Sequence, residues 1–174
     1  MDRYEEIKNI IEQYSKDYGY VEDEDDSWLE ELTEEELEEF EEVETPKVNF
    51  ESGLEQKYID ALEKFLGYEL SPTYKWCLKN YGHGYIYGEE IYTICYDKYP
   101  PDKYNNVSDI IYNNLVNGTI DYKILVFAKG FDTEFCFAID EKNQITGEYP
   151  IYENLSGKLY AKDFLEFLKR RILE

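Results

Sequence analysis

The stretch that decides the fold is residues 123–140, KILVFAKGFDTEFCFAID. Two arms rich in Val, Ile and Phe flank the connection 130–133, which contains a glycine; this is the pattern of a β-hairpin with a four-residue turn. In the second arm, large apolar side chains alternate with the small Cys136 and Ala138, so neither face carries charge. We therefore expect this hairpin to be the central pair of an antiparallel sheet that is covered on both faces.

Helical patterns elsewhere in the chain supply the elements that cover the hairpin. Apolar residues recur at helical spacing in residues 3–16, 52–67, 71–81, 108–116 and 161–173. Ser52 and Ser71 are the expected N-caps of the second and third of these helices, and Gly67 the residue that ends the second. With strands between the helices, this order predicts an α+β domain, an antiparallel sheet with helices packed on it.

Further strands are expected on either side of the hairpin. Residues 81–88, YGHGYIYG, indicate a loop of tight turns that leads into a strand at 90–96. Residues 148–153, EYPIYE, alternate well enough to form another strand. Because proline cannot donate a backbone hydrogen bond, Pro150 indicates an edge or a bulge there.

The charge is strongly negative and unevenly distributed. Lys and Arg total 18 against 40 Asp and Glu, which gives a formal net charge of -22. Such a chain repels nucleic acid and anionic membranes, so its natural partner is a basic protein. Residues 1–50 alone hold 20 acidic and four basic residues, so the first third of the chain is a separate electrostatic unit.

On this basis we divide the chain into an acidic N-terminal extension, residues 1–49, and a domain at residues 50–174. The extension is expected to be partly helical, since Thr33 opens an acidic helical pattern. Because the core helices of the domain start at Ser52 in this interpretation, removal of residues 1–46 is expected to leave the domain folded.

Cysteine, histidine and the hydrophobic segments limit the chemistry and the location. Cys77, Cys95 and Cys136 are odd in number and widely spaced among apolar neighbours, which is typical of buried free thiols in a reducing compartment. His83 is the one histidine and no CxxC pattern is present, so we expect neither a metal nor a cofactor. Neither a signal peptide nor a membrane-spanning run is present, so we expect a cytoplasmic location and no membrane contact.

No catalytic constellation is visible in the sequence. His83 lies between two glycines, but no nucleophile or carboxylate pattern accompanies it. Asp132 and Glu134 flank the hairpin turn, yet turn formation explains Asp132 through side-chain bonding to the backbone. We expect no catalytic residue. A hydrolase that uses His83 is the least supported functional hypothesis for this chain.

Several short motifs occur along the predicted domain in a characteristic order. Along the chain they are Glu55, Ile59, Glu63, Leu66, Gly67, Leu70, Pro72 and Tyr74; Asn80 to Gly84; Phe127, Ala128, Gly130, Asp132 and Phe135 to Phe137; Gly147, Glu148 and Pro150 to Tyr152; and Ala161, Phe164, Phe167 and Leu168. This order resembles the SMI1/KNR4 superfamily, also called SUKH, over roughly residues 50–174. The chain departs from the family pattern where Tyr81 and His83 interleave with the glycines, and at Pro72, which falls one place late.

The resemblance implies a binding protein and not an enzyme. Bacterial members of this family are commonly cytoplasmic immunity proteins that bind and neutralise a polymorphic toxin, frequently a nuclease. A nuclease is basic because it holds phosphate, so an acidic protein is steered to the same surface. The alternative is a regulatory or scaffold interaction module without a toxin, as among eukaryotic members. The identity of the toxin and the oligomeric state stay open.

Two groups of residues are candidates for contacts with a toxin. Acidic side chains of the extension can imitate a phosphate backbone, although a solvated arm is the simpler interpretation; they are Glu22, Asp23, Asp25, Asp26, Glu35, Glu38 and Glu39. The second group combines carboxylates with tyrosines, which give a large contact area at low entropic cost. It consists of Tyr85, Tyr87, Glu89, Glu90, Asp132 and Glu134.

Overall fold

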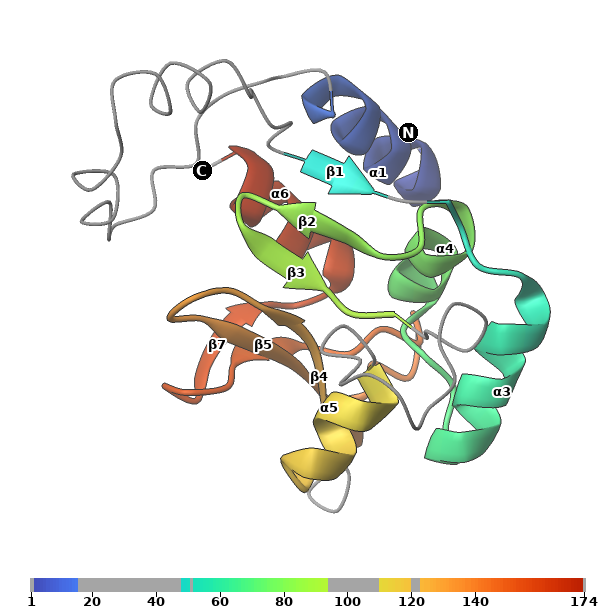
Figure 1. Ribbon diagram of the computed structural model, residues 1–174, viewed down its shortest axis with the longest axis vertical. Coiled ribbons are helices and arrows are strands. Elements are labelled where there is room, and N and C mark those ends of the chain that lie inside the picture. Colours follow the sequence, from blue (N-terminus) through green and yellow to red (C-terminus); the bar gives the residue numbers. More distant parts are fainter. Residues whose placement is uncertain (1, 16–47, 51, 94–109, 120–122, 174) are drawn as a thin grey trace, which may run out of the picture.

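An antiparallel sheet of seven strands forms the centre of the molecule (Figure 1). The computed structural model describes residues 2–15, 48–50, 52–93, 110–119 and 123–173. The strands lie in the sheet in chain order: β1 (Val48–Phe50), β2 (Gly84–Ile86), β3 (Glu89–Ile91), β4 (Ile124–Lys129), β5 (Glu134–Ala138), β6 (Ile151–Glu153) and β7 (Lys158–Ala161). The predicted hairpin is β4 and β5, at the middle of the sheet. The prediction of an α+β fold is confirmed.

Helices pack mainly against one face of this sheet. The helices are α1 (Arg3–Tyr14), α3 (Gln56–Leu66), α4 (Pro72–Asn80), α5 (Ile110–Val116) and α6 (Phe164–Leu173). Helix α1 contacts α4 and α6, and α3 contacts α4. We call the sheet face that packs against α4 and α6 the inner face, and the opposite one the outer face.

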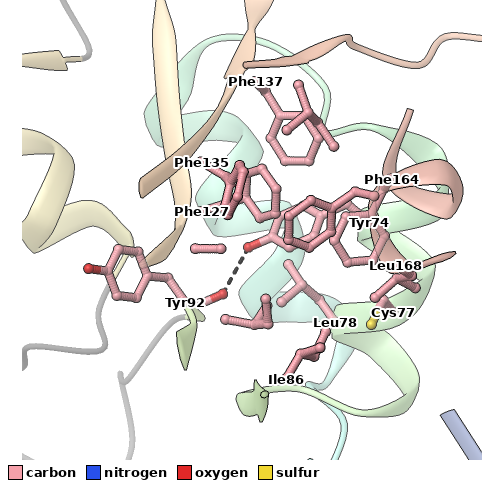
Figure 2. Close-up of a cluster of buried hydrophobic side chains, with 14 of the residues drawn as sticks. Tyr74, Cys77, Leu78, Ile86, Tyr92, Phe127, Phe135, Phe137, Phe164 and Leu168 are labelled. Carbon is pink, nitrogen blue, oxygen red and sulfur yellow. Dashed lines mark hydrogen bonds between the residues drawn. The ribbon is translucent and has the colours of Figure 1, made fainter. Parts of the chain in front are cut away.

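Aromatic side chains fill the space between the inner face and these helices (Figure 2). The buried ring of Tyr74 on α4 lies 5.5 Å from Phe127 and 5.2 Å from Phe137 on the sheet, and 5.1 Å from Phe164 on α6, between ring centroids. Its hydroxyl donates to the backbone oxygen of Tyr92 at 2.8 Å. Burial raises the pKa of Tyr74 well above its usual value, so the phenol is neutral. The inner face is thus a dry aromatic core.

Helix α5 lies beside β4 at the point where β3 has ended. The fully buried side chain of Asn114 donates through Nδ2 to the backbone oxygen of Val126 at 2.7 Å. Its Oδ1 accepts from the backbone nitrogen of Val126 at 2.8 Å. One amide side chain therefore satisfies both backbone groups that a neighbouring strand would otherwise bind.

Several local predictions were wrong. The helix expected from Ser52 begins at Gln56, and Ser52 is exposed, whereas Gly67 ends that helix with φ +78° as predicted. The expected loop at residues 81–88 contains strand β2 and a two-residue turn. Tyr87 and Gly88 in that turn have φ values of 50° and 80°, the conformation that tight hairpins require at both central positions.

The C-terminal part of the sheet also differs from the expectation. Strand β7 was not predicted, so β6 is an interior strand and not an edge. Pro150 precedes β6 and is not itself in a bulge. The pairing of β6 with β7 does shift register, from Ile151–Ala161 to Tyr152–Leu159, so the extra residue is Tyr160 on β7. Cys77 and Cys136 are buried free thiols, as expected. The acidic helical pattern after Thr33, Cys95 and the end of the strand predicted at 90–96 lie outside the described residues.

Helix α1 belongs to the core of the molecule. Its apolar stripe, Ile7, Ile10 and Ile11, is buried where the helix meets α4 and α6. Arg3 binds Asp163 at 2.9 Å between Nη2 and Oδ2, and Tyr4 stacks on Trp76 with ring centroids 5.5 Å apart. The premise that the core helices begin at Ser52 was therefore wrong, although the domain boundary at residues 49 and 50 stays a prediction.

A buried carboxylate holds the N-terminus of α4. Glu148 is 2% exposed, and its oxygens accept hydrogen bonds from the Thr73 backbone nitrogen at 3.1 Å and the Thr73 hydroxyl at 2.8 Å. It also accepts from the Ser71 hydroxyl, and Arg3 of α1 lies 3.6 Å away. Ser71 makes no cap with its own helix. Glu148 thus takes over the capping role, and its negative charge suits the positive end of the helix dipole.

The burial of α1 is tested by Ile7→Ala. Removing a fully buried isoleucine side chain leaves a cavity, so we expect the free energy of unfolding to fall by about 2–5 kcal/mol. Chemical denaturation followed by circular dichroism measures the loss. Gln13→Ala, on the exposed side of the same helix, is the control and is expected to change stability by less than about 0.5 kcal/mol. Equal effects of the two variants would show that α1 does not pack on the core.

The role of Glu148 is tested by comparing Glu148→Ala with Glu148→Gln. The alanine variant leaves two hydroxyls and a backbone nitrogen without their acceptor and removes one of the two carboxylates beside Arg3, so we expect a loss of about 3–5 kcal/mol. Glutamine keeps one acceptor oxygen and the shape, so its loss is expected to be smaller. Glu55→Ala, at an exposed position, serves as the control in the same denaturation experiment. A Glu148→Ala protein as stable as this control would contradict the capping role.

Candidate protein-binding surface

Three hairpin turns lie along one end of the sheet. Because consecutive strands are neighbours and antiparallel, the β2–β3, β4–β5 and β6–β7 connections all fall at the same end. These connections are residues 87–88, 130–133 and 154–157. Four of the six residues predicted in the second group lie in or next to the first two turns, and Tyr85 and Glu90 pair across the strands that the first turn connects. The sheet topology therefore brings together residues that are up to 49 positions apart, from Tyr85 to Glu134.

Four side chains from four strands form a row on the outer face. Tyr85 on β2 is the cross-strand partner of Glu90 on β3, and Glu90 is the partner of Lys129 on β4. Lys129 in turn lies opposite Glu134 on β5. Directly opposed residues in an antiparallel pair share a face, so these four side chains point the same way. We call this set the outer-face row.

The outer-face row is partly exposed and predominantly acidic. Tyr85 is 44% exposed, and Lys129 is exposed between the two carboxylates. The Nε2 atom of His83 lies 3.0 Å from a carboxylate oxygen of Glu90, and the His83 ring meets Tyr85 edge-on at 5.2 Å between centroids. The histidine therefore positions the tyrosine and the glutamate, which gives it a structural role on this face.

Glu89 lies on the inner face and has a different role from its neighbour Glu90. It is 2% exposed, and Arg171 of α6 pairs with it at 2.7 Å between Nε and Oε2. The Thr133 hydroxyl donates to its other oxygen at 2.7 Å. Burial raises the pKa of Glu89, while Thr133 and Arg171 act in the opposite direction. Glu89 thus joins the sheet to α6, and direct contact with a partner would require it to leave this site.

The remaining predicted residues lie in or beside the turns. Asp132 is exposed in the β4–β5 turn. Glu134 is half-buried, and Asn154 of the β6–β7 turn donates to it twice, from its side-chain amide to the carboxylate and from its backbone nitrogen to the Glu134 backbone oxygen at 2.7 Å. Tyr87 is half-buried, and its hydroxyl donates to the backbone oxygen of Ile172 at 3.4 Å. The turns are therefore tied to one another and to α6.

Two residues of this surface were not predicted, Lys129 and Asn154. The strand register of the β4–β5 hairpin places Lys129 opposite Glu134, and this could have been inferred by pairing the arms around the four-residue turn. Asn154 had no signal, because β7 was not expected. The seven acidic candidates between Glu22 and Glu39 lie outside the described residues.

The described part of the chain gives no indication of a metal site or a membrane span. There, no three His, Cys, Asp or Glu side chains are grouped so that they would hold a metal ion. Within the same residues, no helix is both long and apolar enough to cross a bilayer.

A family model matches the sequence over most of these elements. The SUKH_6 model, described as SMI1-KNR4 cell-wall, matches residues 56–168, from α3 to the middle of α6. The chain belongs to the SUKH superfamily. SUKH domains are generally non-catalytic interaction modules and include immunity proteins. No curated protein matches the sequence.

The motif residues of the SUKH domain now have a physical explanation. Tyr74 is the centre of the aromatic core, and Glu148 caps the helix on which Tyr74 lies. Gly130 allows the hairpin turn, because a side chain there would meet Thr133 and Glu89. These residues hold the scaffold, whereas the outer-face row is presented on it.

The different roles of Glu89 and Asp132 give a direct test. Glu89→Ala leaves the guanidinium of Arg171 without its buried partner, so we expect a loss of about 3 kcal/mol in unfolding free energy. Asp132→Ala changes an exposed turn residue and is expected to cost less than about 0.5 kcal/mol. Urea denaturation of both variants provides the measurement. Equal stability of the two variants would show that the contacts of Glu89 with α6 are not structural.

Proposed function

We propose that this SUKH domain is an immunity protein that binds and neutralises a cognate toxin, a basic nuclease-type domain, by stoichiometric contact. The observation that carries the proposal is the outer-face row, where an exposed tyrosine stands beside carboxylates on a rigid hairpin scaffold. Tyrosine is enriched at interface hot spots, and a sheet places its side chains with little conformational freedom. The family membership and the net charge of -22 support the same function.

The charge distribution favours a basic partner. Glu90, Asp132 and Glu134 carry three negative charges against the single positive charge of Lys129 around this surface. The whole chain adds a long-range negative field, which accelerates encounter with a basic protein and repels nucleic acid. Binding to a nuclease domain would block its substrate groove, so neutralisation needs no chemistry by this chain. In this proposal the protein acts in the cytoplasm and is not an enzyme.

We expect the gene beside this one to encode a nuclease-like toxin domain, and the proposal is tested with that domain. Co-expression is expected to prevent killing by the toxin domain, and the two proteins are expected to co-purify. Tyr85→Ala is expected to weaken the affinity at least about 30-fold, since truncating an interface hot spot costs about 2 kcal/mol or more. Unchanged killing together with no co-purification would defeat the proposal. Capture of an unrelated regulatory protein with no rescue would favour the scaffold alternative.

Salt dependence tests the electrostatic part of the proposal separately. We expect the association rate constant to fall at least about tenfold between 0.01 M and 0.5 M salt, because screening removes long-range steering. The triple variant Glu90→Gln, Asp132→Asn and Glu134→Gln is expected to lower the rate at low salt. A control with Glu12→Gln, Glu55→Gln and Asp60→Asn removes the same charge from exposed positions on other elements. Stopped-flow binding that is independent of salt would contradict steering.

A further inference from the structure

A cavity lies on the outer face next to the outer-face row. Its volume is about 320 Å³. The wall facing the sheet is formed by Ile124, Cys136, Ala138 and Tyr152 on strands β4, β5 and β6. These residues share the outer face, because Ile124 pairs with Ala138 and Cys136 pairs with Tyr152 across the strands. The outer face therefore forms one wall of a cavity at this point.

The walls of the cavity combine apolar groups with carboxylates. Cys136 is 3% exposed, and burial, assisted by Glu134, raises the pKa of its thiol to about 12, so it is neutral. Its thiol donates to oxygens of Tyr152 and Asn154 at 3.6 and 3.7 Å. The rim carries Asp140, Glu141, Glu153 and Lys123. The rim therefore holds three carboxylates against one lysine, a formal net charge of -2.

The one lysine of the rim pairs with only one of its three carboxylates. Lys123 is already paired with Asp140 at 2.8 Å. The Tyr152 hydroxyl donates to Glu141 at 2.8 Å, and this hydrogen bond raises the pKa of Tyr152. A ligand for this cavity therefore has an apolar stem and a cationic end. Arginine and lysine side chains have this shape, and a tyrosine ring in the wall offers a cation–π contact.

We propose that this cavity is the anchor site for an arginine or lysine side chain of a basic protein partner. The inference rests on the proposed function and names one of its contacts. Asn154 joins the cavity to the outer-face row, because it lines the cavity and donates to Glu134. The row and the cavity are therefore parts of one continuous surface. A segment of the chain itself is a poor occupant, since residues 16–47 contain 16 acidic and two basic residues and are repelled by the rim.

The first test uses a small probe and requires no toxin. N-acetyl-arginine methylamide is titrated into the full-length protein, and its neutral isostere N-acetyl-citrulline methylamide is the control. Backbone amide shifts in nitrogen-15 correlation spectra are expected to change at Cys136, Ala138 and Tyr152 with the arginine derivative and to saturate at millimolar concentration. Equal effects of the two compounds, or changes scattered over all acidic surfaces, would overturn the proposal.

Variants of the cavity make this test specific. Glu141→Gln removes one rim charge and is expected to weaken the arginine derivative at least threefold. Ala138→Phe fills the cavity and is expected to abolish saturable binding. Asp60→Asn on α3 removes a charge outside the cavity and is expected to have no effect. If Ala138→Phe does not fold, the comparison of Glu141→Gln with Asp60→Asn decides, and equal affinities in these two variants would overturn the proposal.

The same variants distinguish the anchor from the proposed function. With the neighbouring nuclease-like domain, Glu141→Gln is expected to raise the dissociation constant at least fivefold relative to Asp60→Asn. An unchanged dissociation constant overturns the anchor while leaving the immunity function intact. If the wild-type protein does not bind the nuclease domain, the immunity proposal fails instead. If the wild-type protein also does not bind the arginine derivative, the anchor proposal fails as well.

Discussion

The buried carboxylate of Glu148 connects three parts of the chain that are far apart in sequence. It accepts from Ser71 and Thr73 at the start of α4 and pairs with Arg3 of α1, while its own backbone leads into β6. A carboxylate buried to this degree is stable only when its oxygens are bonded, so these elements must be in place together. The orientation of α4, and with it the position of Tyr74 in the core, depends on this one group.

The sequence predicts best where a signal is local. The β4–β5 hairpin, the C-terminal glycine of α3 and the buried stripe of α6 were all predicted, because each depends on periodicity or on a single backbone conformation. Ser71 was correctly placed before its helix and yet makes no cap with it, because its hydroxyl bonds a residue 77 positions away. Helix α1 was predicted, but its burial in the core was not. An apolar stripe on a helix shows that one side is covered, but it does not show which part of the protein covers that side.

The candidate surface, too, was predictable only in its local features. The tyrosines and carboxylates were predicted from composition, but their separation into inner and outer face needs the strand register. Glu89 and Glu90 are adjacent in β3, so their side chains point to opposite faces of the sheet. The carboxylate of Glu89 is buried against Arg171, and that of Glu90 is on the outer face. The two-residue turn at Tyr87 and Gly88 fixes this register, and the sequence had been interpreted there as a loop. The cavity could not be predicted, because strand β7 and the turn with Asn154 had no recognisable pattern.

The two faces of the sheet have different roles in the described part of the chain. Helices α4 and α6 bury the large aromatic residues of the inner face, and α1 closes this layer from behind. The outer face has smaller groups at this point, Cys136, which is buried, and Ala138, which is half-buried. Asn114 of α5 binds the backbone of β4 in place of a neighbouring strand. The side chains of the outer-face row point away from the aromatic core, so a contact made by the exposed ring of Tyr85 does not require Tyr74 or the helices to move.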